Sequence, residues 1–151
     1  MLDVTLTTNE TFFNKCGDQW VSYLNEILMQ VALQAEGELA KEAPKDTGTL
    51  RRSFNVKDDG ILSKSILTNT DYWMYVVYGT APHTIRPKKG NKMLHWKNKN
   101  GEGYAKKVEH PGTAPNNFPQ RAVNKIQSRG DIEKITKKVL IKHGVLEWLI
   151  Q

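Results

Sequence analysis

The sequence of 151 residues predicts an α+β fold. We expect a long N-terminal helix, a mostly antiparallel sheet, a protruding basic hairpin and a C-terminal helix. Two observations lead to this prediction. An apolar stripe at helical spacing runs through residues 18–43, and residues 50–80 contain short apolar segments of the kind that form strands. The length suits a single domain, residues 1–151, with its own hydrophobic core.

Composition excludes several classes of protein. Residues 1–6 have neither a basic start nor an apolar block, so a signal peptide is not expected. The apolar run at residues 73–78 is far too short to span a membrane. Cys16 is the only cysteine, so an internal disulfide is impossible and a reducing compartment is expected.

The net charge of +6 is divided unevenly along the chain. Residues 1–80 carry 7 basic and 11 acidic side chains, whereas residues 81–151 carry 15 basic and 5 acidic ones. An acidic first half and a basic second half can meet each other between neighbouring subunits, and the basic half can also meet nucleic acid. Composition alone leaves both alternatives open.

The long helix is the strongest structural prediction. Its apolar residues recur at spacings of three and four, and polar residues fall largely on the other side. The apolar stripe consists of Trp20, Leu24, Ile27, Leu28, Val31, Ala35 and Leu39, and the polar side of Glu26, Gln30, Gln34, Glu38 and Lys41. Before this helix, alternation at residues 2–6 predicts a short strand and residues 9–16 a helical turn.

Residues 43–53 are expected to end the helix and turn the chain. Pro44 cannot continue a helix, and Gly48 takes a positive φ without steric cost. Strands are predicted at 53–56 and 61–67, around an Asp-Asp-Gly turn. The aromatic run at 72–78 reads as a buried strand or a short buried helix; periodicity does not decide between them, and we group it with the strands.

Residues 81–117 read as a loop-rich insertion that carries a basic hairpin. Strands are predicted at 93–97 and 104–108, and the segment 86–107 holds 8 basic residues and 1 acidic residue. Such a hairpin can follow a phosphate backbone, dock on a protein or keep a sheet edge soluble. Its candidate contact residues are Lys88, Lys92, Trp96, Lys97, Lys99, Lys106 and Lys107, with Tyr104 interleaved. A C-terminal helix is predicted over 118–143, interrupted at Gly130, and an apolar tail or strand follows it.

The sequence predicts no catalytic, cofactor or metal site, and therefore no enzyme. None of the four histidines makes a pair at zinc-ligand spacing, and Cys16 lies on an apolar helical face. The acidic pair Asp58 and Asp59 is explained by its turn. The chain has neither a glycine-rich phosphate loop nor a serine-centred nucleophile elbow.

Four motifs together resemble a known family. They are the turn at 43–53, the segment 72–76, the Tyr-Gly-Thr triplet at 78–80 and the His-Pro-Gly-Thr motif at 110–113. In this order they are similar to the tail-component family of long-tailed bacteriophages, the tail-completion or head–tail joining proteins of the virion neck. The residues that carry the likeness are Pro44, Asp46, Thr47, Gly48, Leu50, Arg51, Tyr72, Tyr78, Gly79, Thr80, His110, Pro111, Gly112 and Phe118. Val77 and Trp73 depart from the pattern, which usually has Glu and a small residue there.

The resemblance implies a structural virion protein, made in the cytoplasm of a bacterial host, without a cofactor. Such proteins form rings, often hexameric and in some cases only on assembly, between the head connector and the tail-tube or tail-terminator proteins. Their long helix packs on the sheet.

Opposite charges on two patches would set the direction of a head-to-tail ring. The candidate acidic patch is Glu26, Glu36 and Glu38, and the candidate basic patch is Arg121, Lys125 and Lys134. A turn needs neither Arg51 nor Arg52, so these two are also candidates for contact with a neighbour. The alternative is a nucleic-acid-binding module that uses the lysine-rich hairpin 86–107.

Overall fold

The computed structural model describes residues 17–88, 90, 92–98 and 101–145, and it divides into two compact units. The first, which we call the core unit, comprises residues 1–73 and 117–151. The second, which we call the hairpin unit, comprises residues 74–116. The predicted strand at 2–6, the helical turn at 9–16, Lys99 and the tail after residue 145 lie outside the described residues.

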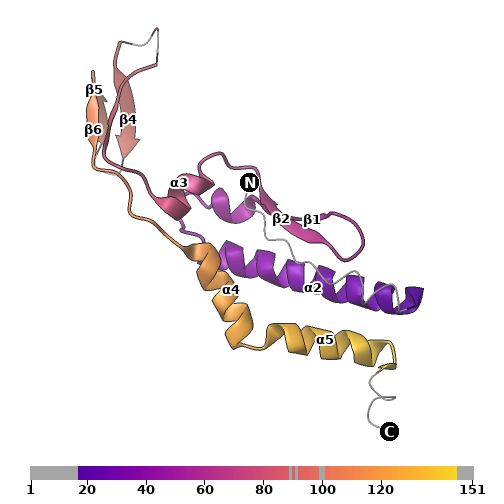
Figure 1. Ribbon diagram of the computed structural model, residues 1–151. Coiled ribbons are helices and arrows are strands. Elements are labelled where there is room, and N and C mark those ends of the chain that lie inside the picture. Colours follow the sequence, from indigo (N-terminus) through magenta and orange to yellow (C-terminus); the bar gives the residue numbers. More distant parts are fainter. Residues whose placement is uncertain (1–16, 89, 91, 99–100, 146–151) are drawn as a thin grey trace. The chain divides into compact units, whose positions relative to one another are not determined.

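The core unit is built around the predicted long helix, α2 (Asp18–Glu42). The strands β1 (Phe54–Asp58) and β2 (Lys64–Thr68) form an antiparallel hairpin on one side of α2, and the helices α4 (Phe118–Ser128) and α5 (Asp131–Lys142) lie along another side (Figure 1). The short 3₁₀ helix η1 (Leu50–Arg52) leads from the turn into β1. The α+β fold class is confirmed, with a long helix, antiparallel strands and C-terminal helices.

The core forms where the predicted stripe of α2 meets these elements. Ile27 and Val31 of α2 pack against Val139 of α5, which is completely buried. Phe54 of β1 and Phe118 of α4 approach with ring centroids 6.0 Å apart. Each of these buried aliphatic or aromatic side chains contributes about 1.5–3 kcal/mol by leaving water. The apolar stripe of α2 therefore packs with the β1–β2 hairpin and with both C-terminal helices in one core.

Glu38 is buried, although it belongs to the predicted polar side of α2. We expected it on the polar surface, but it is only 1% exposed. The reason is that α4 and α5 cover a second side of α2, so polar positions on that side become buried. The carboxylate keeps its charge because Lys41 and Arg129 both donate to Oε1, at 2.8 and 3.0 Å.

The segment at residues 73–78 differs from the prediction, whereas the break in the C-terminal helix agrees with it. The run at 73–78 is a helix, α3 (Trp73–Tyr78), so its grouping with the strands is wrong. Backbone bonds explain its end: the amide of Asn116 donates to the carbonyls of Val76 and Val77, at 3.1 and 3.2 Å. The C-terminal helix is broken as predicted, because Gly130 adopts a left-handed φ of 62° between α4 and α5.

The hairpin unit holds two pairs of antiparallel strands. β3 (His83–Ile85) pairs with β6 (Val108–His110), and β4 (Leu94–Asn98) pairs with β5 (Gly101–Ala105). The prediction of a second strand at 104–108 is wrong. Pairing of Asn98 with Gly101 starts that strand three residues earlier, and pairing resumes with β6 after a break at 106–107.

Candidate protein-interaction site

Two of the family motifs close on each other within the hairpin unit. Thr80 and Thr113 exchange backbone hydrogen bonds of 3.0 and 3.1 Å, and a glycine precedes each threonine. Gly79 has φ +72°, and a Cβ there would lie 2.3 Å from the Thr113 carbonyl oxygen. Gly112 has φ +87°, and its Cβ would lie 2.3 Å from the Thr80 carbonyl oxygen. Only glycine permits this approach, so the two motifs form one clasp, defined as residues 79–80 and 112–113.

Residues 79–80 of the clasp precede β3, and residues 112–113 follow β6. Next to the clasp, the rings of His83 and His110 stack with centroids 5.1 Å apart. The amide of Gly112 donates to Nδ1 of His110 at 3.1 Å. The sequence did not reveal this histidine pair, because 26 residues separate the two and only the β3–β6 register brings them together.

The turn at 43–53 is closed by its own side chains. Arg51 Nε donates to the Ala43 carbonyl oxygen at 2.8 Å, which provides a partner for a group at the end of α2. Arg51 is half-buried, so our expectation that it faces a neighbour meets a structural alternative. Arg52 is exposed and reaches the Thr47 carbonyl at 3.4 Å. Gly48 has φ +78°, as the turn requires.

Most members of the charged patches that we predicted for a ring contact also have partners within the chain, and Glu36 is the exception among the described residues. Glu26 accepts hydrogen bonds from Lys142 and His143, both at 2.8 Å, and these lower its pKa to about 2. Glu42 binds both Lys125 and Arg121, and these two cations lower the pKa of Glu42.

Two more members of those patches have partners in the core unit. Arg129 and Lys41 hold the pKa of Glu38 low, and the carboxylate in turn raises the pKa of Arg129. Lys134 lies 3.6 Å from Asp131 and donates to the Arg129 carbonyl. Glu26, Glu38 and Glu42 of α2 are therefore neutralised by bases of the same chain that lie in or next to α4 and α5.

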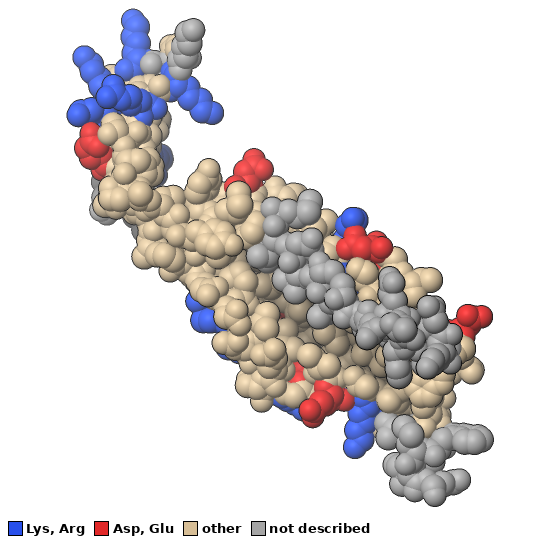
Figure 2. All heavy atoms as spheres, in the orientation of Figure 1, with Lys and Arg blue, Asp and Glu red and all other residues tan. Residues whose placement is uncertain are grey.

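The two units differ in net charge. Counted over the whole sequence, the core unit has 14 basic and 14 acidic residues, whereas the hairpin unit has 8 basic and 2 acidic ones. The entire net charge of +6 thus belongs to the hairpin unit. Figure 2 shows Lys and Arg crowded on the hairpin unit, and both signs mixed over the core unit. The net charge is therefore better described by structural unit than by the two halves of the sequence.

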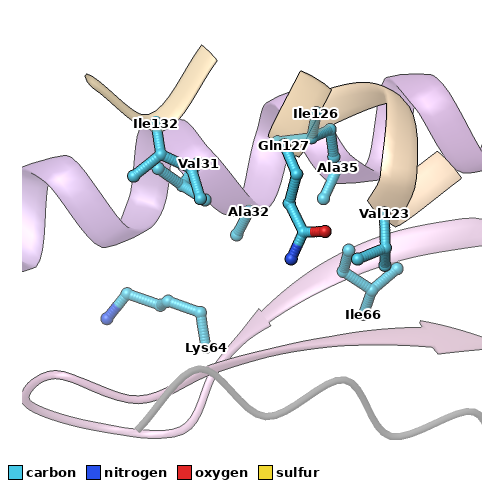
Figure 3. Close-up of a pocket in the computed structure, with 9 residues that line it drawn as sticks. All are labelled: Val31, Ala32, Ala35, Lys64, Ile66, Val123, Ile126, Gln127 and Ile132. Atoms are coloured by element: carbon cyan, nitrogen blue, oxygen red, sulfur yellow. The ribbon is translucent and has the colours of Figure 1, made fainter. Parts of the chain in front are cut away.

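An apolar cavity of about 140 Å³ lies inside the core unit, between α2, β2, α4 and α5. Its lining is Val31, Ala32, Ala35, Lys64, Ile66, Val123, Ile126, Gln127 and Ile132 (Figure 3). The Lys64 side chain is fully buried, and its Nζ donates to Asn25 Oδ1 at 2.6 Å, Asp58 Oδ1 at 2.7 Å and the Gly60 carbonyl at 3.1 Å. These three bonds use all the donors of the amine, so it stabilises the β1–β2 turn.

The described part of the chain, which leaves out 1–16 and the other ranges given above, contains no cluster of three metal-ligating side chains. None of its helices is long and apolar enough to cross a membrane.

Comparison with known proteins gives a match to a family model over part of the chain. Residues 10–79 match the model of the HK97-gp10-like family, described as "Bacteriophage HK97-gp10, putative tail-component". No curated protein and no solved structure matches the chain. The match covers less than half of the chain, and over residues 10–79 it confirms the family likeness seen in the sequence. It indicates a phage tail component and covers α2, the turn and the β1–β2 hairpin, ending at Gly79 of the clasp.

Proposed function

We propose that the protein completes the phage tail at the neck of the virion, where it joins the head connector to the tail as part of an oligomeric ring. The family match supports a structural tail component. The observation that carries the proposal further is the charge division: a neutral core unit leads into a hairpin unit that holds all the net charge. A unit of this kind suits contact with other virion proteins.

The structure changes which residues we propose for contact between copies. Glu26, Glu38 and Lys125 already have partners within the chain. Breaking those pairs to form equivalent ones across an interface brings no net gain. Glu36 makes no ion pair among the described residues, and Arg52 is exposed, so we propose these two for the ring contact.

The alternative function is nucleic-acid binding by the hairpin unit, favoured by its charge. Lys97, Lys99 and Lys106 would then contact phosphates, and affinity for a DNA duplex would fall steeply with salt. Reversal of these three charges should abolish that affinity. An unchanged affinity rules the alternative out.

The proposed function is tested by the mass of the purified protein in solution. Sedimentation is measured alone, over a range of concentrations, and then with the purified head-connector and tail-tube proteins of the same phage. We expect a defined oligomer, either alone or when one of these partners is added. A protein that stays monomeric at every concentration and with both partners contradicts the proposal.

A further inference from the structure

The strand register gives the β4–β5 hairpin two different faces. Side chains alternate between faces along a strand, so the pairs Leu94–Ala105 and Trp96–Gly103 share one face. This face, which we call the tryptophan face, carries no charged side chain at these four positions. The opposite face carries the pairs His95–Tyr104 and Lys97–Glu102.

Trp96 dominates the tryptophan face. Its ring lies over Gly103, where a Cβ would come within 2.5 Å of the ring atoms Cε2 and Cζ2. Glycine at this position lets the indole approach the partner strand this closely, and Trp96 remains 41% exposed. A large aromatic side chain held in place and still exposed is typical of the centre of a protein interface.

The opposite face is satisfied by its own contacts. His95 and Tyr104 stack with centroids 4.6 Å apart and an angle of 15° between their planes. Glu102 accepts from Lys97 at 3.3 Å and lies 3.4 Å from His95 Nε2. Polar and ionic side chains of this kind suit solvent, so the two faces are suited to different surroundings.

The tryptophan face is flanked by two cations, Lys92 and Lys106. Lys92 lies two residues before Leu94, and Lys106 follows Ala105; both are exposed and make no ion pair among the described residues. The core unit has 14 basic and 14 acidic residues, and Glu26, Glu38 and Glu42 of α2 already pair with bases within it, so this unit has no net negative charge to match them. A second copy of this chain is therefore a poor electrostatic partner for this face.

We propose that the tryptophan face docks on an apolar strip with an acidic rim on another protein of the virion. Trp96 and Leu94 supply the apolar contact, and Lys92 and Lys106 supply charge complementarity at its edge. A two-stranded hairpin is only marginally stable alone in water, and cover over this face stabilises it. This inference rests on the proposed neck function, since it requires a neighbouring virion protein.

The ring contacts favour a protein over nucleic acid as the occupant. Single-stranded nucleic acid binds aromatic side chains by stacking bases on free ring faces. The Trp96 ring lies close against Gly103, and one face of Tyr104 covers His95, on opposite sides of the hairpin. The two rings therefore cannot form one continuous stacking platform.

Calorimetric titration of the full-length protein against the purified head-connector and tail-tube proteins tests the docking. Trp96→Ala should raise the dissociation constant for one of them by at least about 30-fold, the size of an interface hot spot. Tyr104→Ala is the matched control, because it removes a cross-strand ring contact from the same hairpin but leaves the tryptophan face intact; we expect less than about a threefold change. Ala105→Glu is a second test, which adds a carboxylate to the face without removing Trp96 and should also weaken binding by tenfold or more.

The outcomes separate this inference from the proposed function. If the protein binds a neighbour and forms an oligomer, but Trp96→Ala and Tyr104→Ala weaken binding equally or Ala105→Glu has no effect, only the docking face is wrong. If the wild-type protein binds neither neighbour, the docking face fails; if it also stays monomeric at every concentration, the proposed function fails with it. A 20-base-pair DNA duplex serves as a third probe. The inference is overturned if the protein binds this duplex and neither neighbour, and if the double variant Lys92→Glu, Lys106→Glu no longer binds the duplex. Nucleic acid would then be the occupant of the face.

Discussion

Replacing Gly79 by alanine tests the clasp. The added Cβ would lie 2.3 Å from the Thr113 carbonyl oxygen and 2.9 Å from the backbone nitrogen of Pro115, so the two segments of the clasp must separate. Separation breaks the two hydrogen bonds between Thr80 and Thr113, worth about 1 kcal/mol each. The φ of +72° adds a further cost of about 1 kcal/mol for a residue with a side chain. Together these give about 3 kcal/mol of local destabilisation.

Native-state hydrogen exchange measures this loss directly, because the two amides that donate in the clasp are those of Thr80 and Thr113. A loss of about 3 kcal/mol corresponds to exchange roughly 100-fold faster at both amides. Gly37→Ala is the control: it lies in α2, nothing is within 4 Å of its Cβ position, and it should stabilise the helix by up to about 1 kcal/mol. Unchanged exchange at both clasp amides in Gly79→Ala refutes the reasoning.

Three other substitutions test the core unit. Because the pKa of Glu26 is lowered from 4.5 to about 2, its stabilising effect is present above pH 4.5 and is lost as the pH falls toward 2. In the Glu26→Gln variant the melting temperature should therefore change less between pH 4.5 and pH 2 than in the wild-type protein. The same change in both proteins contradicts the pairing. Asp58→Ala should lower the midpoint of chemical denaturation more than Lys64→Met does, since Asp58→Ala leaves the buried Lys64 amine without its anion; equal shifts speak against a buried charge there. Arg51→Ala should lower stability by about 1.5 kcal/mol and Arg52→Ala by much less, because Arg51 donates to the Ala43 carbonyl after α2, whereas the exposed Arg52 reaches only the Thr47 carbonyl at 3.4 Å; the reverse order would show that Arg51 does not close the turn.

The sequence predicts those parts of the fold that depend on local chemistry. The helix α2 follows from the spacing of its apolar residues, and its end follows from Pro44. The break between α4 and α5 follows from Gly130, whose left-handed φ the structure confirms. The family motifs were also recognised from sequence, although their separation along the chain hid that Gly79 and Gly112 meet.

The errors arise where tertiary contacts decide. Glu38 looked polar and exposed because nothing in α2 alone shows that α4 will cover it. The run at 73–78 has the composition of a strand, but its end is fixed by the distant amide of Asn116, which favours the helix. The same limit applies to the charges: a count along the chain shows acidic and basic halves, and only the fold shows that α2 and the C-terminal helices neutralise each other.

The candidate site was predicted in part. The lysine-rich hairpin was visible in the composition, whereas its two faces depend on the register that pairs Trp96 with Gly103. A shift of that register by one residue would move Trp96 to the opposite face. The sequence therefore indicates a contact element, and the structure is needed to say which side of it makes the contact.

The location of the protein in the virion tests the central claim most directly. Electron microscopy of assembled phage particles, with the protein labelled by a specific antibody and by density comparison against particles that lack it, shows where it lies. Our account predicts a ring of density at the junction of head and tail, and tails that fail to join heads when the protein is missing. Density along the tail tube or at the tail tip, or a particle that does not contain the protein, contradicts a role in joining head and tail.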